Sequence, residues 1–142
     1  MSWESYNLDR EAQRLVLAYR DKEGVIGQSH KMRTTVPYGL ERFWGEQLRL
    51  LGKKDRKDKQ KGEYWRDTWK TFVKIMDKAG IKLPKEEVKN DDTKKIEEVA
   101  AKLWGLDIED QRICLAVLTQ FCDSLVWWTQ RYKKPGDSDD TN

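Results

Sequence analysis

The residue types best suited to catalysis are scarce in this chain of 142 residues and are not spaced for it. His30 is the only histidine, and the two cysteines, Cys114 and Cys122, stand far from it in the sequence. On one helix these cysteines would be separated by a rise of about 12 Å, which is too long for a disulfide. No GxSxG, HExxH or Gly-rich phosphate loop occurs. We therefore expect two buried free thiols, and no active site, metal site or cofactor.

Basic side chains are the group whose spacing does suggest a function. Residues 31–61 contain ten Lys and Arg against four Asp and Glu, whereas the net charge of the whole chain is only +3. Within this region the stretch GKKDRKDKQKG at 52–62 has no apolar residue, and we expect it to form a mobile basic loop. A local excess of positive charge suits an anionic partner such as nucleic acid. The alternative is a lysine-rich surface that contacts only solvent.

The helix expected before this loop has an apolar front and a basic back. Steps of 100° place Arg42 and Arg49 opposite the apolar side chains, and Lys53 and Arg56 would join them if the helix continued. Glu46 stands one turn from Arg42, but Arg49 has only Lys53 four residues away. Like charges without partners cost some stability, so a polyanionic partner would explain them. The front consists of Leu40, Phe43, Trp44, Gln47, Leu48 and Leu51.

Apolar spacing and capping residues predict five helices in total. We expect them at 6–22, from Thr34 or Thr35 to about 52, at 63–79, at 93–104 and at 107–134. A connector at 24–33, marked by two glycines, is expected to be short and to lie on the surface, and 81–92 is expected to be a linker. Trp65 and Trp69 could provide a base-stacking platform, but their helical spacing favours core packing.

The segment 107–134 is the piece around which we expect the fold to be built. In steps of four and three, one stripe along it carries Cys114, Leu118, Phe121, Leu125, Trp128 and Tyr132. Such a helix is roughly 40 Å long and spans a small domain. We predict an all-α fold, a bundle of about five helices with the long C-terminal helix as its spine. It would form a single helical domain at 1–134, followed by a disordered acidic tail at 135–142. No apolar run is long enough for a membrane span, and the first residues do not form a signal peptide, so we expect a cytoplasmic protein.

Two stretches resemble a known family. The sequence KMRTTVPYGLERFWGEQLRLLGKK at 31–54 resembles the second-helix region of the small, all-helical subunits of type III CRISPR effector complexes. The residues at 125–132 are similar to the apolar–Trp–x–x–Arg–aromatic ending of the Cmr-module small subunit in particular. The Csm-module small subunit is the second match, through the segment 34–42.

The resemblance implies a non-catalytic subunit in several copies, stacked head to tail beside the backbone subunits and the large subunit of the complex. It would contact the guide (CRISPR) RNA and the target RNA through their phosphates, support target binding and leave cleavage to its neighbours. Matching the family's pattern carries over Arg42 and Arg131 as RNA contacts. The charge pattern adds Lys31, Arg33, Arg49, Lys53, Lys54 and Arg56. Such contacts recognise the backbone rather than the base sequence.

A different class of function also fits the sequence. A helical protein–protein adaptor would bind no nucleic acid and would use Trp127, which lies off the apolar stripe of 107–134, as an interface anchor. A small enzyme would instead depend on His30 or on a cysteine, and we expect substitutions at these residues to have no effect.

Overall fold

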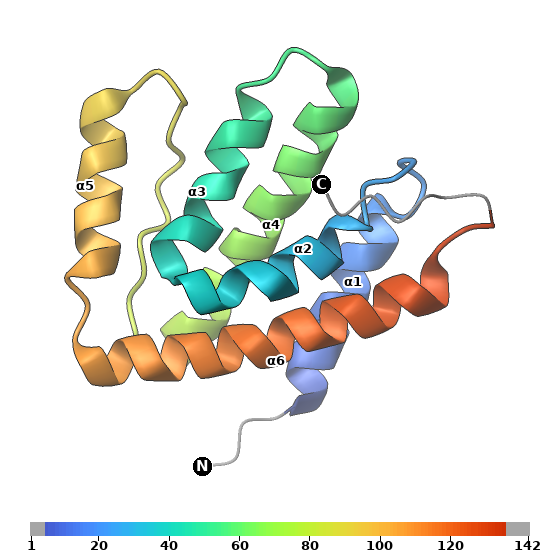
Figure 1. The fold of residues 1–142 in the computed structure, drawn as a ribbon. Coiled ribbons are helices and arrows are strands. Elements are labelled where there is room, and N and C mark those ends of the chain that lie inside the picture. Colours follow the sequence, from blue (N-terminus) through green and yellow to red (C-terminus); the bar gives the residue numbers. More distant parts are fainter. Residues whose placement is uncertain (1–4, 136–142) are drawn as a thin grey trace.

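The computed structural model describes residues 5–135, and this part of the chain contains six α-helices, a short 3-10 helix and no strand (Figure 1). The elements are α1 (Ser5–Tyr19), α2 (Gln28–Thr35), the 3-10 helix η1 (Val36–Tyr38), α3 (Leu40–Leu51), α4 (Arg56–Lys78), α5 (Thr93–Trp104) and α6 (Ile108–Tyr132). The all-α prediction is confirmed. The helix count exceeds the expected five because the segment 24–33 contributes α2. Of the predicted tail at 135–142, only Pro135 lies within the described residues.

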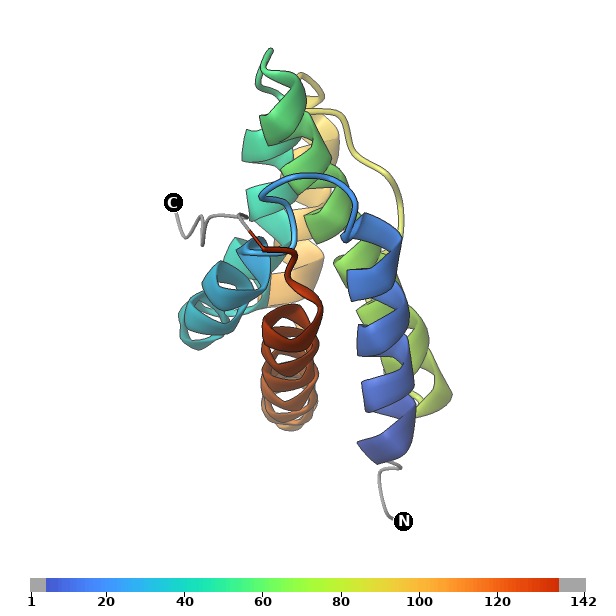
Figure 2. The ribbon, with the colours of Figure 1, turned by 90° about the vertical axis from the view of Figure 1, so that its right-hand side faces the viewer.

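The predicted long C-terminal helix is present as α6, which runs along one side of the fold with α1 and α2 on its two flanks (Figures 1 and 2). Its apolar stripe is buried from Cys114 to Leu125, whereas Trp128 and Tyr132 near its end are only partly buried. Burial raises the pKa of the Cys114 thiol to about 11 and that of the Cys122 thiol further. Both cysteines are free and remain protonated near neutral pH.

The segment 24–33 is largely buried, and the prediction of a surface connector is wrong. Val25, Ile26 and Met32 are almost completely shielded from solvent and belong to the core. Gly24, with a φ of +74°, turns the chain back after α1. The chain therefore makes a tight turn at Gly24. The apolar residues that follow are buried because burial is more favourable for them than exposure to water.

Polar residues of α2 are buried because they bond to one another and to the neighbouring helices. Trp65 Nε1 donates to Gln28 Oε1 over 2.9 Å. The Ser29 hydroxyl lies 2.6 Å from that of Tyr64 and accepts a hydrogen bond from Thr129 Oγ1 over 2.8 Å. Burial raises the pKa of Tyr64, so its hydroxyl stays neutral. This network joins α2, α4 and α6 and offsets the cost of burying its polar atoms.

The second predicted helix begins later than expected. The hydroxyls of Thr34 and Thr35 donate back to the carbonyl oxygen of Lys31, over 3.0 and 2.7 Å, instead of capping a new helix. After η1, α3 starts behind Gly39, whose φ of +103° lies in the region that favours glycine. The apolar front of α3 is buried as expected, apart from Leu51, which is partly exposed.

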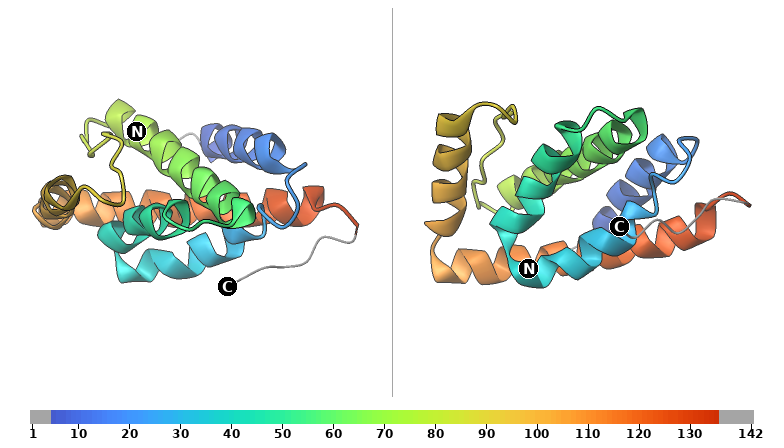
Figure 3. Two further views of the ribbon diagram at one scale, coloured as in Figure 1. Left: turned by 90° about the horizontal axis from the view of Figure 1, so that it is seen from above. Right: turned by 45° about the horizontal axis from the view of Figure 1, so that its top comes forward.

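The predicted basic loop at 52–62 is mostly helical, so that prediction is wrong as well. Asp55 caps α4 by accepting a hydrogen bond from the backbone two residues on (3.1 Å), which leaves only a short turn between α3 and α4 (Figure 3). Lys61 and Gly62 are buried. A Cβ atom added at Gly62 would lie 2.8 Å from Leu51 Cγ, so the two helices approach closely where this residue has no side chain.

The aromatic residues of α4 pack in the core, as their spacing predicted. The rings of Phe43 and Trp65 have centroids 5.0 Å apart. Trp69 Nε1 donates to the carbonyl oxygen of Pro84 over 3.2 Å, which ties the linker at 81–92 to α4. The linker leads to α5, which stands beside α3 (Figure 3). Because Trp65 and Trp69 are both buried, neither has a free ring face for a nucleotide base.

Candidate nucleic-acid interface

The eight basic residues expected to contact RNA occupy three places in the fold. Lys31 and Arg33 are on α2, Arg42 and Arg49 on α3, Lys53 and Lys54 in the following turn, Arg56 at the start of α4 and Arg131 near the end of α6. In Figure 1 the turn between α3 and α4 is at the top, and the C-terminal end of α6 is at the lower right. The structure thus groups the residues of α3 and its turn and leaves Arg131 apart from them.

Glu46 neutralises part of this charge. Lys31 Nζ lies 2.7 Å from Glu46 Oε2, and Arg49 donates to both carboxylate oxygens over 2.8 and 2.6 Å. Burial by itself would raise the pKa of this carboxyl group, but the hydrogen bonds from Arg49 and Lys31 outweigh it and lower the pKa. The expectation that Arg49 has no partner is wrong, because its carboxylate stands three residues away rather than four.

Arg33 connects two helices. Its Nε donates to Asp123 Oδ1 over 2.7 Å, and this pair joins α2 to α6. A guanidinium held by a carboxylate has less charge to offer a phosphate. Arg33 would therefore attract a phosphate less strongly than an unpaired arginine does.

Four exposed basic residues on α3, in the following turn and at the start of α4 have no carboxylate partner among residues 5–135. They are Arg42, Lys53, Lys54 and Arg56. Arg42 was expected to pair with Glu46, but its guanidinium instead lies 5.5 Å from the ring centroid of Tyr38. From Arg42 to the end of α3 the helix rises by about 14 Å. We refer to these four residues together with Arg49 as the cationic ridge.

Arg131 is held by aromatic rings. Its guanidinium lies 5.5 Å from the ring centroid of Trp128 and 6.0 Å from that of Tyr132. These two rings are nearly parallel, at 11°, and Tyr132 is anchored by a hydrogen bond from Gln13 Nε2 to its hydroxyl (3.0 Å). Trp127 is 57% exposed and lines a shallow hollow with Arg131. The structure thus places the two residues expected to bind RNA and protein, respectively, side by side.

Two exposed features did not enter the sequence-based predictions. Tyr38, the last residue of η1 between α2 and α3, is 68% exposed. Its position four residues before Arg42, outside every apolar stripe, was the available signal. The second feature, the apolar corner, consists of Trp104 and Ile108, which are exposed on either side of the turn between α5 and α6. Apolar groups exposed together are typical of a contact surface.

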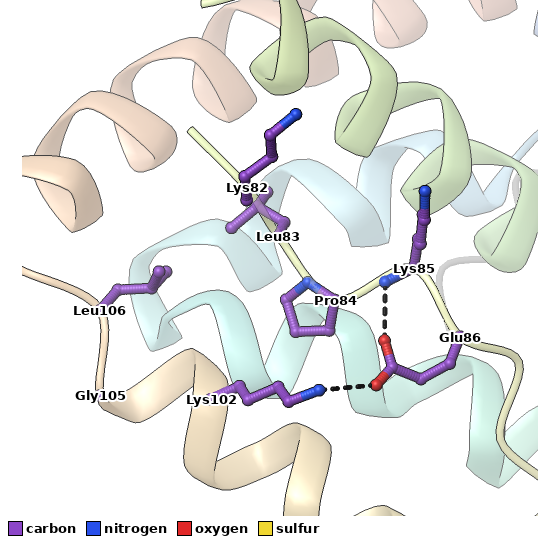
Figure 4. A pocket seen from close by; sticks show the side chains of 8 residues that line it. All are labelled: Lys82, Leu83, Pro84, Lys85, Glu86, Lys102, Gly105 and Leu106. Carbon is purple, nitrogen blue, oxygen red and sulfur yellow. Dashed lines mark hydrogen bonds and ion pairs between the residues drawn. The ribbon is translucent and has the colours of Figure 1, made fainter. Parts of the chain in front are cut away.

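A further hollow lies between the linker at 81–92 and the C-terminal part of α5 (Figure 4). Leu83, Pro84 and Leu106 provide its apolar lining. Lys102 Nζ bonds to Glu86 across it, over 2.9 Å. This ion pair closes a surface loop onto α5, and the lining includes neither a histidine nor a nucleophilic hydroxyl or thiol.

Within residues 5–135, no three His, Cys, Asp or Glu side chains gather as a metal ion would require. In the same part of the chain, none of the helices has the length and hydropathy needed to cross a bilayer. Comparison with protein-family models, with curated proteins and with solved structures finds no match. The residues themselves therefore carry the functional argument.

Proposed function

We propose that this chain is a non-catalytic RNA-binding structural subunit of a type III CRISPR ribonucleoprotein effector. It would stack in several copies along the guide and target RNA, beside the backbone and large subunits, and hold the RNA through its phosphates. The observation that carries the proposal is the cationic ridge. Its exposed cations lie on two packed helices and the turn between them, and they are mostly unpaired within residues 5–135.

The ridge suits a phosphate backbone for a physical reason. Like charges on neighbouring turns repel one another, and a polyanion relieves that repulsion while releasing its own counterions. Lys and Arg side chains on α3, in the following turn and at the start of α4 would contact phosphates without regard to base sequence. This is the mode expected of a subunit that must accept any guide sequence.

The contact set proposed for the folded chain is narrower than the one expected from the sequence. The strongest candidates for phosphate contacts are the four residues without a carboxylate partner among the described residues, Arg42, Lys53, Lys54 and Arg56. Arg49 and Lys31 share Glu46 and keep one net positive charge between them. Arg33 is occupied by Asp123, and Arg131 would form a separate contact at the far end of α6.

A protein–protein adaptor without RNA binding is the second candidate. The exposed Trp127 and the apolar corner around Trp104, which is 69% exposed, favour it. RNA binding requires the cationic ridge, whereas an adaptor that binds through these apolar surfaces does not. Substitutions in the ridge therefore distinguish the two functions.

The test replaces Arg42, Lys53, Lys54 and Arg56 by Gln and measures RNA affinity against salt concentration. The slope of log affinity against log salt concentration should become less steep by about 3, because four phosphate contacts are lost. A fourfold rise in salt should then cost the wild type roughly 50- to 150-fold more affinity than the variant.

The matched control replaces four exposed lysines elsewhere on the surface and loses the same charge. They are Lys74, Lys78, Lys89 and Lys94. We expect this control to keep most of the wild-type slope. Equal slopes in both variants would mean that only net charge matters, and an unchanged slope in the ridge variant would favour the adaptor.

A further inference from the structure

Tyr38 is an exposed aromatic residue in a rigid setting. It closes η1, in which Val36 is buried and the backbone N–H of Gly39 donates to the Val36 carbonyl oxygen over 3.0 Å. Pro37 restricts the backbone further. A residue that is 68% exposed gains little from burial of its ring, so packing does not account for an aromatic side chain at this position.

Arg42 lies over one face of this ring, and Tyr38 as a whole is 68% exposed. The guanidinium lies 5.5 Å from the ring centroid, which is the geometry of a cation–π contact. Because Arg42 has no carboxylate partner among residues 5–135, its N–H donors and its charge remain available to a ligand. The contact also limits the conformations that the long side chain can adopt, so less entropy is lost when it binds.

The position of the pair links it to the cationic ridge. Tyr38 lies two residues before the start of α3, and Arg42 is the first residue of the ridge along that helix. The tryptophans of α4, which the sequence offered as an alternative stacking platform, are buried. An exposed aromatic ring at one end of a row of cations matches the combination that single-stranded nucleic acids require, a stacking surface beside an electrostatic track.

We propose that Tyr38 and Arg42 bind one unpaired nucleotide of RNA. The base would stack on the face of the Tyr38 ring opposite Arg42, and a neighbouring phosphate would bind to the Arg42 guanidinium. This inference rests on the proposed RNA-binding function and adds a preference for unpaired RNA, such as a single strand or a flipped-out base, over a continuous duplex. Every base has a flat face, so the site would accept all four bases.

The experiment compares the full-length protein with its Tyr38→Ala and Tyr38→Phe variants. Binding is measured to a short single-stranded RNA and to a blunt RNA duplex with the same number of phosphates. Loss of one stacked base should weaken single-strand binding by roughly 5- to 150-fold in Tyr38→Ala, with little change for the duplex. Tyr38→Phe keeps the ring and should bind like the wild type.

A fluorescent base analogue in the single strand supplies an independent readout. Stacking should quench its fluorescence on binding to the wild type and to Tyr38→Phe, but not to Tyr38→Ala. Because Tyr38 is exposed, both variants should unfold at the wild-type temperature.

The failures of the two proposals are distinguishable. If the ridge variant loses binding to both RNAs while Tyr38→Ala binds both normally, the phosphate interface stands and the stacking site is overturned. Equal weakening of single-strand and duplex binding by Tyr38→Ala would also overturn the stacking site. If the wild type binds neither RNA, the proposed function itself fails.

Discussion

Replacing Glu46 by Gln tests whether this carboxylate holds two cations that would otherwise repel each other. Glu46 accepts hydrogen bonds from Arg49 within α3 and pairs with Lys31 on α2. Its side chain is only 14% exposed, so solvent screens these interactions less than it would on an open surface. The substituted glutamine would keep the size of the side chain and remove its charge.

The expected loss of stability at neutral pH is about 1–2 kcal/mol. Exposed ion pairs contribute up to about 1 kcal/mol each, and Glu46 makes two. Because the folded-state pKa of Glu46 lies below its ordinary value of 4.5, the ionised form is favoured by folding. This contribution is therefore fully present above pH 4.5 and is lost as the pH falls through the lower, folded-state pKa.

The assay is urea unfolding of the wild type and of Glu46→Gln at neutral pH and again at a pH below the lowered, folded-state pKa of Glu46. We expect the difference in unfolding free energy to shrink towards zero at the acidic pH, where Glu46 in the wild type is protonated too. A Lys82→Gln variant, which loses an ion pair with Asp77 on the surface, is the control and should change stability less. A difference between wild type and Glu46→Gln that is equally large at both pH values would refute the electrostatic explanation and indicate lost packing.

The contacts of α3 lead to two more predictions. Glu46→Gln should strengthen RNA binding and steepen its salt dependence, because Lys31 and Arg49 become available to phosphates; weaker binding would exclude them from the interface. Gly62→Ala should destabilise the protein by about 1–3 kcal/mol in thermal or urea unfolding, since its Cβ would lie 2.8 Å from Leu51 Cγ. The control Gly45→Ala, whose nearest contact would be 3.7 Å away, should be neutral or stabilising, and equal losses in both variants would contradict the close approach of α3 and α4.

The parts of the fold that the sequence predicted well are those with strong helical periodicity. The stripe of α6 and the aromatic face of α4 recur every three to four residues over many turns, so burial of one side follows from spacing alone. The helix expected at 93–104 is also present as α5, and its start follows from a local cap, because Asp92 accepts a hydrogen bond from the Lys95 backbone N–H (3.1 Å). In all three cases, residues close together in the sequence determine the structure.

The parts that the sequence did not predict depend on contacts between distant segments. In the sequence, Gln28 and Ser29 belong to a stretch that reads as a polar connector. In the fold they are buried, because Trp65 and Tyr64 provide their hydrogen-bond partners. The polar stretch at 52–62 was predicted as a loop because it has no apolar residue, yet the cap at Asp55 and packing against α3 make most of it helical.

The candidate site was predicted only in part for the same reason. The sequence identified which residues are basic, but their partners arise from the fold. Lys31 forms an ion pair with Glu46 on α3, and Arg33 forms one with Asp123 on α6. These pairings, together with the exposure of Tyr38, change which residues remain available to RNA.

The measurement that tests the central claim most directly is purification of the tagged chain from its native host, with the bound RNA sequenced and the bound proteins identified. The proposal predicts recovery of guide RNA carrying CRISPR-repeat sequence together with backbone subunits of a type III complex. It also predicts that the variant lacking Arg42, Lys53, Lys54 and Arg56 recovers less of that RNA. Recovery of protein partners without RNA from the wild type would contradict the claim and would leave the cationic ridge as a solvated surface.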